Sequence, residues 1–331
     1  MDLRRQSVGR TSAHAPDPRT EVHAYTVTNG QGHAITVWTY GATLVDVSVP
    51  DRHGRLANVV HRLPDLRTYE NRTLNPYVGS TVGRYCRAIR NGTFTLDGVP
   101  HVLDRNDGEH HLHGGPAGFD RRVWQAWTEE SADEAAVVLR LVSPDGDQGY
   151  PGTVDVEAAY RLHRSGRLTF DYRATTTAPT IIGLTNHAYW NLAGGGTIDG
   201  HHLAINADRT VAFDSDLLPR SGPPVPLAGT ALDYRTPRRI GAAAIDNFFV
   251  LDDATWAAEL ADPDSGRRMT VVTDQPGMGV YSSDGPAAPR RGLCLEAGAW
   301  PDAANRPDFP SVRLDPGDVY EHRTTHHFSV D

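Results

Sequence analysis

The segment 108–120, GEHHLHGGPAGFD, gathers three histidines and a carboxylate around a pair of glycines and ends in a Phe-Asp step. On an extended strand, His111 and His113 would point both imidazoles to the same face, a spacing that suits metal ligation. Acid/base catalysis and a crowded structural loop are the other interpretations. The residues after His113, Gly-Gly-Pro-Ala-Gly-Phe-Asp, include no glutamate that could complete a metal site. We therefore expect no metal here.

A fourth histidine, His187, lies in the stretch LTNHAYWNL, next to Tyr189 and Trp190. The ordinary histidine pKa of about 6.5 lets the imidazole give or take a proton near neutral pH after a small shift. His187 is therefore a candidate general acid or base. A hydrogen-bonded histidine of the core is the alternative.

Two carboxylates sit within apolar surroundings. Glu296 follows Gly-Leu-Cys-Leu, so we expect it on or beside a buried strand end, where burial raises a carboxyl pKa toward the range of a general base. A buried ion pair with Arg290 or Arg291 is the alternative. Asp246, in Ile-Asp-Asn-Phe-Phe, could orient a ligand hydroxyl or cap backbone N–H groups at a turn.

The elements that would position these groups are predicted to be strands, because apolar and β-branched residues alternate or form short runs. Examples are HAITVWTY (33–40), TLVDVSVP (43–50) and AAVVLRLVSP (135–144). Hairpin turns are predicted at Asp97-Gly98, Ser165-Gly166 and Ser265-Gly266, where glycine supplies a positive φ. The predicted fold class is all-β, an antiparallel sandwich or barrel. We expect residues 1–18 to form a flexible tail and residues 19–331 a single domain.

The composition of the chain excludes several classes of function. The chain has 331 residues and a net charge of −9, and its 32 Lys+Arg residues are all arginine. Without lysine there is no Schiff base, no pyridoxal-phosphate anchor and no P-loop lysine. The acidic balance argues against a nucleic-acid partner. Cys86 and Cys294 form no CxxC, and the sequence shows neither a signal peptide nor a membrane span, so we expect a reduced, cytoplasmic protein with no membrane partner.

Several stretches mix aromatic residues with ionisable or amide groups, which is typical of sugar-binding clefts. They are NPYVGSTVGR (75–84), DGDQGYPG (145–152), LTNHAYWNL (184–192), AIDNFFVL (244–251) and CLEAGAWPDAANRPDFP (294–310). We therefore expect a small-molecule carbohydrate or carbohydrate-like substrate.

Taken in order, these segments resemble those of the aldose 1-epimerases, or galactose mutarotases. The resemblance covers roughly residues 20–330 and includes LHGGPAGFD, GYPG, NHAYWNL, DQPGMGVY and Leu-Glu followed by PDAANRPDFP. It implies a large antiparallel β-sandwich of the galactose mutarotase type, called a supersandwich. It also implies an isomerase that interconverts the α and β anomers of an aldose without a metal or other cofactor, as a monomer or homodimer.

The resemblance implies a role for each matching residue. Glu296 matches the general base that takes the proton of the anomeric hydroxyl, and His187 matches the general acid that protonates the ring oxygen. His113 and Asp246 match residues that hold the sugar. The opened aldehyde rotates about C1–C2 and closes from its other face.

The sequence also departs from the family pattern. Arg87 replaces the usual Asn, and Ala88 replaces the Arg that contacts the sugar. Gly279 and Gly298 stand where the family has Gln, and His110 replaces an Asn. We expect Arg87 to compensate in part for Ala88 as a substrate-binding residue. Adjacent side chains on a strand point to opposite faces, so this requires a local twist or bulge.

These departures leave several functions open. The first is a cofactor-independent aldose 1-epimerase. The second directs the same acid/base pair to a modified sugar or a lactol-type natural product. The third is a non-catalytic carbohydrate-binding protein, and the last is a cupin-like metal enzyme.

Overall fold

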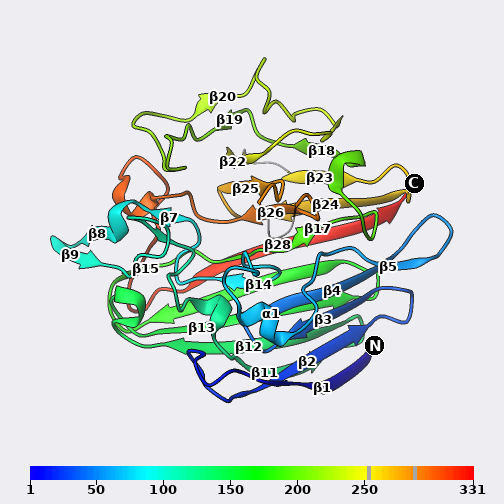
Figure 1. Ribbon diagram of the computed structural model, residues 1–331, viewed down its shortest axis with the longest axis horizontal. Helices are drawn as coiled ribbons and strands as arrows, with labels where there is room; N and C mark the ends of the chain where they lie inside the picture. The colour runs from blue at the N-terminus through cyan, green and yellow to red at the C-terminus, as the bar shows by residue number, and fades with distance from the viewer. Residues whose placement is uncertain (252–254, 286–288) are drawn as a thin grey trace.

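Antiparallel sheets make up the structure, a computed structural model that describes residues 1–251, 255–285 and 289–331 (Figure 1). The largest sheet has nine strands, in the order β11 (Gln125–Glu130), β12 (Glu134–Ser143), β13 (Val154–His163), β14 (Leu168–Thr176), β28 (Tyr320–Val330), β24 (Arg267–Thr273), β23 (Ala258–Ala261), β18 (His202–Ile205) and β21 (Arg238–Arg239). All pairings between named strands in the described residues are antiparallel.

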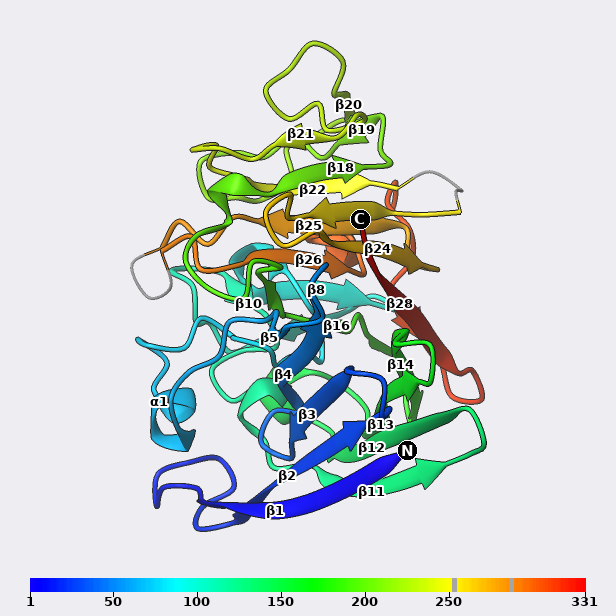
Figure 2. The ribbon, with the colours of Figure 1, turned by 90° about the vertical axis from the view of Figure 1, so that its right-hand side faces the viewer.

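Two further sheets pack on this large one. The first contains β1 (Asp2–Arg10), β2 (Glu21–Thr28), β3 (Ala34–Trp38), β4 (Thr43–Pro50) and β5 (Leu56–Asn58) in that order. The second has the order β17 (Tyr189–Trp190), β26 (Leu293–Ala297), β25 (Gly277–Tyr281), β22 (Asp246–Val250), β19 (Arg209–Thr210) and β20 (Val225–Pro226). Figure 2 shows the second sheet at the end of the molecule away from β1.

Short elements complete the chain. Four strand pairs stand alone: β7 (Ala88–Ile89) with β10 (His111–Leu112), β6 (Thr81–Val82) with β16 (Thr185–Asn186), β15 (Thr180–Ile181) with β27 (Arg313–Leu314), and β8 (Thr93–Leu96) with β9 (Val99–Val102). Within the described ranges the α-helix is α1 (Leu66–Glu70), and 3₁₀ turns cover Arg90–Gly92, Phe119–Arg121, Asp147–Gly149, Ile198–Gly200 and Ala303–Asn305. Among the described residues, no helix is long and apolar enough to span a membrane.

The all-β antiparallel prediction is confirmed. Side chains of β13 alternate between buried and partly exposed, as expected for a strand with one face on the core. One buried apolar cluster includes Val37, Val156, Leu260 and Leu295, which come from all three large sheets. The core thus lies between the nine-stranded sheet and the two smaller ones.

The three predicted hairpin turns are also confirmed. Asp97-Gly98 joins β8 to β9, Ser165-Gly166 joins β13 to β14, and Ser265-Gly266 joins β23 to β24. Gly98 has a φ of +77° and Gly166 has +85°. These left-handed conformations explain why glycine occupies the turns.

The predicted flexible tail is wrong for residues 2–10. This segment is strand β1, which pairs with β2 from Asp2 opposite Thr28 to Arg10 opposite Glu21. Further along, the Asp17 carboxylate accepts a hydrogen bond from the Val123 amide at 2.7 Å. Strand β1 is mostly exposed, so backbone pairing with β2 holds it, with Leu3 and Val8 partly buried against the core.

Candidate active site

A cavity of about 300 Å³ opens over β22, β25 and β26. It is lined by all five predicted site residues: Arg87, His113, His187, Asp246 and Glu296. Aromatic and proline side chains form much of the remaining wall: Pro76, Tyr77, Tyr189, Phe213, Phe248, Tyr281 and Pro301. A concave site with apolar walls and a few converging polar groups is the usual form of a small-molecule site.

Glu296 lies on β26, which is flanked by β17 and β25 and is buried along its whole length. Glu296 is only 2% exposed, as expected for a buried strand position. The predicted alternative partners are wrong, because Glu296 Oε2 accepts a hydrogen bond from Arg87 Nη1 at 3.0 Å. Arg290 pairs instead with Asp199 and Asp284.

His187 approaches Glu296 from the neighbouring chain segment. Tyr189, two residues later, is paired with Cys294 across β17 and β26, and this register places His187 Nε2 3.6 Å from Glu296 Oε1. Burial lowers the pKa of His187 below the usual 6.5, while the Glu296 carboxylate opposes that shift. A Glu296 carboxylate and a protonated His187 would stabilise each other at this distance. With a ligand between them, the two side chains can exchange protons with it.

The other imidazole nitrogen of His187 faces a thiol. Cys294 Sγ lies 3.5 Å from His187 Nδ1. Burial raises the thiol pKa well above its usual value, so the thiol stays protonated. A thiol is a weak donor and a weak acceptor, and this contact is compatible with Nδ1 in either protonation state. His187 can therefore change its charge without losing a hydrogen-bond partner.

His113 enters the same cavity by a change of backbone direction. Its φ is +52°, and β10 ends at the residue before it. Nδ1 of His113 accepts a hydrogen bond from the Arg87 amide at 3.1 Å, so the neutral ring carries its proton on Nε2. Burial holds the pKa of His113 well below its usual value. His113 is thus a neutral hydrogen-bond donor.

The expected shared face for His111 and His113 is wrong, because the left-handed backbone at His113 breaks the strand geometry. His111 points to a different environment, where Nδ1 lies 2.6 Å from the Asp104 carbonyl and Nε2 lies 2.6 Å from the Tyr150 hydroxyl. Burial lowers its pKa to about 4. His111 is thus a hydrogen-bonded histidine of the core, the alternative that sequence analysis raised for His187.

Arg87 reaches the cavity through the local twist that sequence analysis required. Its φ is +86°, and its guanidinium lies 5.4 Å from the centre of the Phe248 ring. Nη2 donates to the Glu296 backbone carbonyl at 2.6 Å, in addition to the carboxylate contact. Ala88 also lines the cavity but brings no polar side-chain atom.

Asp246 begins β22 opposite Tyr281 of β25, at the rim of the cavity. Its side chain is exposed, yet the surrounding protein limits its hydration, and this desolvation together with the Glu296 charge raises its pKa to about 6. A carboxyl with this exposure can accept a hydrogen bond from an incoming hydroxyl.

The donor atoms of His113, His187 and Glu296 all lie within 4.8 Å of one another, so their spacing alone would suit a metal ion. The Arg87 cation holds Oε2 of the carboxylate and leaves Oε1 facing His187. His111 is not part of this cluster. The HxH pair is therefore not a pair of ligands to one ion.

Sequence reasoning missed two neighbours of the acid/base pair. Tyr77 stacks on His187 with a centroid distance of 5.8 Å and meets His113 edge-on at 4.7 Å. Its place in the polar stretch NPYVGSTVGR was the available signal. Cys294 was considered only for disulfide and metal chemistry, and nothing in its sequence position indicates a contact with His187.

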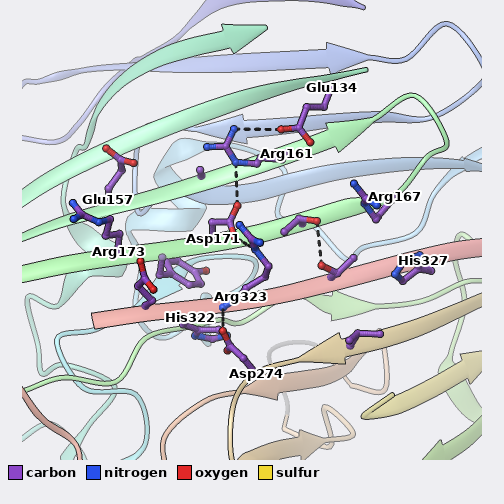
Figure 3. A pocket seen from close by; sticks show the side chains of 16 residues that line it. Glu134, Glu157, Arg161, Arg167, Asp171, Arg173, Asp274, His322, Arg323 and His327 are labelled. Atoms are coloured by element: carbon purple, nitrogen blue, oxygen red, sulfur yellow. Dashed lines mark hydrogen bonds and ion pairs between the residues drawn. The ribbon is translucent and has the colours of Figure 1, made fainter. Parts of the chain in front are cut away.

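A second hollow, of about 960 Å³, lies on the outer face of the nine-stranded sheet (Figure 3). Its charged lining residues are Glu134, Glu157, Arg161, Arg167, Asp171, Arg173, Asp274, Glu321 and Arg323. Asp171 accepts hydrogen bonds from Arg161 at 3.0 Å and from Arg323 at 2.5 Å. We call this surface the charged groove.

Comparisons with known proteins agree with the architecture. A family model described as aldose 1-epimerase matches residues 23–327. The galactose mutarotase of Sus scrofa is 37% identical over 319 residues, covering 89% of this chain and 91% of that protein. The aldose 1-epimerase of Escherichia coli K12 is 31% identical over 352 residues, covering 98% and 100%. A crystal structure of galactose 1-epimerase from Lactobacillus acidophilus has a TM-score of 0.87 at 27% identity, covering 99% of each chain.

Proposed function

This chain belongs to the aldose 1-epimerase family and interconverts the anomers of an aldose, and we propose that Glu296 and His187 carry the proton transfers. The isomerase prediction is confirmed. The relatives do not favour the alternatives of a redirected activity, a non-catalytic sugar-binding protein or a cupin-like metal enzyme.

In the competent form Glu296 is ionised and His187 is protonated. A sugar lies between Glu296 Oε1 and His187 Nε2, which are 3.6 Å apart in the free protein and separate to admit it. The carboxylate takes the proton of the anomeric hydroxyl while the imidazolium gives its Nε2 proton to the ring oxygen. The C1–O5 bond breaks, and a neutral open-chain aldehyde is left between two neutral side chains. Rotation about C1–C2 and the reverse transfers give the other anomer.

Three other residues are proposed to hold the sugar. His113 donates its Nε2 proton as a neutral ring, since burial keeps it from taking a charge. Asp246 accepts from a hydroxyl at the rim, and Arg87 supplies N–H donors at the wall. Such neutral and charged hydrogen-bond partners orient the hydroxyls while leaving the proton transfers to Glu296 and His187.

The observation that carries this proposal is the contact between two buried titratable groups, Glu296 and His187, in the wall of a sugar-sized cavity. Because several relatives are named for galactose, we propose an aldohexose such as galactose as substrate. We further propose a reduced compartment, in keeping with the free thiols of Cys86 and Cys294.

Polarimetry of freshly dissolved α-galactose tests the function directly. The protein is expected to accelerate the approach to the anomeric equilibrium, and NMR of the anomeric protons extends the measurement to other hexoses, pentoses and deoxysugars. If no sugar in this panel equilibrates faster than in buffer, the proposed function is wrong.

A further inference from the structure

The Glu296 carboxylate is held from one side by a single cation. Arg87 Nη1 donates to Oε2 at 3.0 Å and Nη2 donates to the backbone carbonyl of the same residue at 2.6 Å. The side chains of Arg87 and Glu296 are only 12% and 3% exposed. Two hydrogen bonds from one planar guanidinium fix both position and orientation. They leave Oε1 as the oxygen that faces His187.

The guanidinium can lie there only because of the residue across the strand pair. Gly279 on β25 is directly opposite Glu296 on β26. A Cβ atom at Gly279 would lie closer than 3.0 Å to Cζ and to both terminal nitrogens of Arg87. Even an alanine would therefore displace the guanidinium or be displaced by it.

The backbone conformation at position 279 does not require a glycine. Gly279 lies inside a regular strand and is not among the residues with a positive φ. An L-residue could adopt its backbone conformation, so the glycine is required by the space that Arg87 occupies.

We propose that Arg87 and Gly279 form a matched pair that positions the base: Gly279 leaves room for the guanidinium, which holds Glu296 by Oε2 and presents Oε1 to the sugar. This inference rests on the proposed function and deepens it. It makes Arg87 a positioning residue for Glu296 in addition to its place in the sugar-binding wall. It also means that the residue at position 279 affects kcat through the space it leaves for Arg87, although it makes no polar side-chain contact.

A cycle of three variants tests the pairing. Arg87→Ala and Gly279→Ala should each lower kcat at least tenfold, because each removes the guanidinium from Oε2. Arg87→Ala/Gly279→Ala should turn over about as slowly as Arg87→Ala alone, since the space for the new methyl group is then vacant. Wild-type kcat in Gly279→Ala, or losses that multiply in the double variant, would overturn the proposal.

Gly200→Ala is the matched control. A Cβ at Gly200 meets no heavy atom within 4 Å, and its φ is not positive. This variant should keep wild-type kcat and stability.

Chemical rescue separates positioning from a purely structural role. Millimolar methylguanidinium should restore part of kcat in Arg87→Ala, because the small cation can occupy the vacated position. It should not do so in Arg87→Ala/Gly279→Ala, where the alanine methyl group fills that position. No rescue of Arg87→Ala, or equal rescue of both variants, contradicts the proposal.

The pairing is also tested without turnover. Free energies of unfolding in urea should show that Gly279→Ala destabilises the protein when Arg87 is present and has little effect when it is absent. Additive effects on stability would refute the pairing even if no sugar were turned over. Conversely, the two substitutions could have non-additive effects on stability in a protein that does not interconvert anomers. That result would contradict only the proposed function.

Discussion

The active-site cavity and the charged groove contain the same kinds of side chains, arginines, carboxylates and histidines, but they differ in burial. In the cavity, the His187 and Glu296 side chains are 6% and 3% exposed. In the groove, Arg323 is 69% exposed and Glu134 is 34% exposed. The groove is also the larger hollow, at about 960 Å³ against about 300 Å³.

The burial of the charges separates the reactive site from the groove. Charges in the groove form ion pairs that water and salt screen, so each pair contributes little. Charges in the cavity are taken out of water, and their protonation depends strongly on one another and on whatever enters between them. Burial of the titratable groups, rather than size or the number of charges, distinguishes the cavity.

The largest expected effect comes from removing the acid or the base. Glu296→Gln keeps the side-chain shape but cannot take a proton, and His187→Asn cannot give one. Each should lower kcat by roughly 10²–10⁴-fold, or about 3–5 kcal/mol of transition-state stabilisation. The double variant should be far less impaired than the product of the two losses, because both groups act in one cycle.

The matched control replaces a glutamate of the charged groove. Glu134→Gln should leave kcat unchanged. Near-full turnover in a Glu296→Gln protein that is folded by circular dichroism would show that the proposed mechanism is wrong.

A smaller effect is expected from His111, a histidine of the segment 108–120 that does not line the cavity. In the folded protein the pKa of His111 is about 4, so the ring stays neutral until the pH falls to that value. In the unfolded chain the ring takes up its proton near pH 6.5. Its stabilising contribution is therefore complete above pH 6.5 and is lost as the pH falls toward 4, by up to about 3 kcal/mol. His111→Asn should be less stable than wild type at pH 7 but should lose less stability on acidification.

Urea unfolding at pH 7 and at about pH 5 measures this difference. If wild type and His111→Asn lose the same free energy of unfolding between the two pH values, His111 does not have the depressed pKa described here.

The pH dependence of kcat/KM should reflect the acid/base pair of the cavity. The profile should be bell-shaped, because Glu296 must be ionised and His187 must be protonated. Burial lowers the pKa of His187, so the protonated fraction falls as the pH rises through a value below the usual 6.5. Above that value kcat/KM should fall about tenfold per pH unit. A limb at higher pH than 6.5 would contradict the assignment to His187.

The smallest effect is expected in the charged groove. Arg161 pairs there with Glu134 at 3.6 Å, and both side chains are partly exposed. Glu134→Gln should change the free energy of unfolding by no more than about 1 kcal/mol. A thermal melt in low and high salt measures this, and a loss of several kcal/mol would show that the two hollows are more alike than their burial indicates.

Sequence reasoning predicted the elements whose local signals are strong. The turns at Asp97-Gly98, Ser165-Gly166 and Ser265-Gly266 could be predicted because glycine marks a positive φ. Strand β1 could not, because its residues are mostly polar and exposed and it is held by backbone hydrogen bonds to β2. Pairing of this kind leaves little pattern in one strand's own sequence.

The candidate site shows the same limit. His187 and Glu296 were identified through motifs, but their contact depends on the pairing of β17 with β26, which no local pattern encodes. Arg290 and Arg291 are the arginines nearest to Glu296 in sequence, yet its partner is Arg87. The positive φ of Arg87 and of His113 lies in non-glycine residues, and tertiary contacts impose it.

Strand β28 completes the nine-stranded sheet by lying between β14 and β24 (Figure 1). A ribosome makes both neighbours before it makes β28, and the segment 274–319 separates β24 from it. At roughly 5–20 residues per second, the emerging chain therefore carries two unpaired strand edges for several seconds. Each nascent molecule must avoid pairing these edges with another polypeptide until residues 320–330 arrive. We therefore expect production of this protein in cells to depend on chaperone capacity and on the pace of translation over that interval.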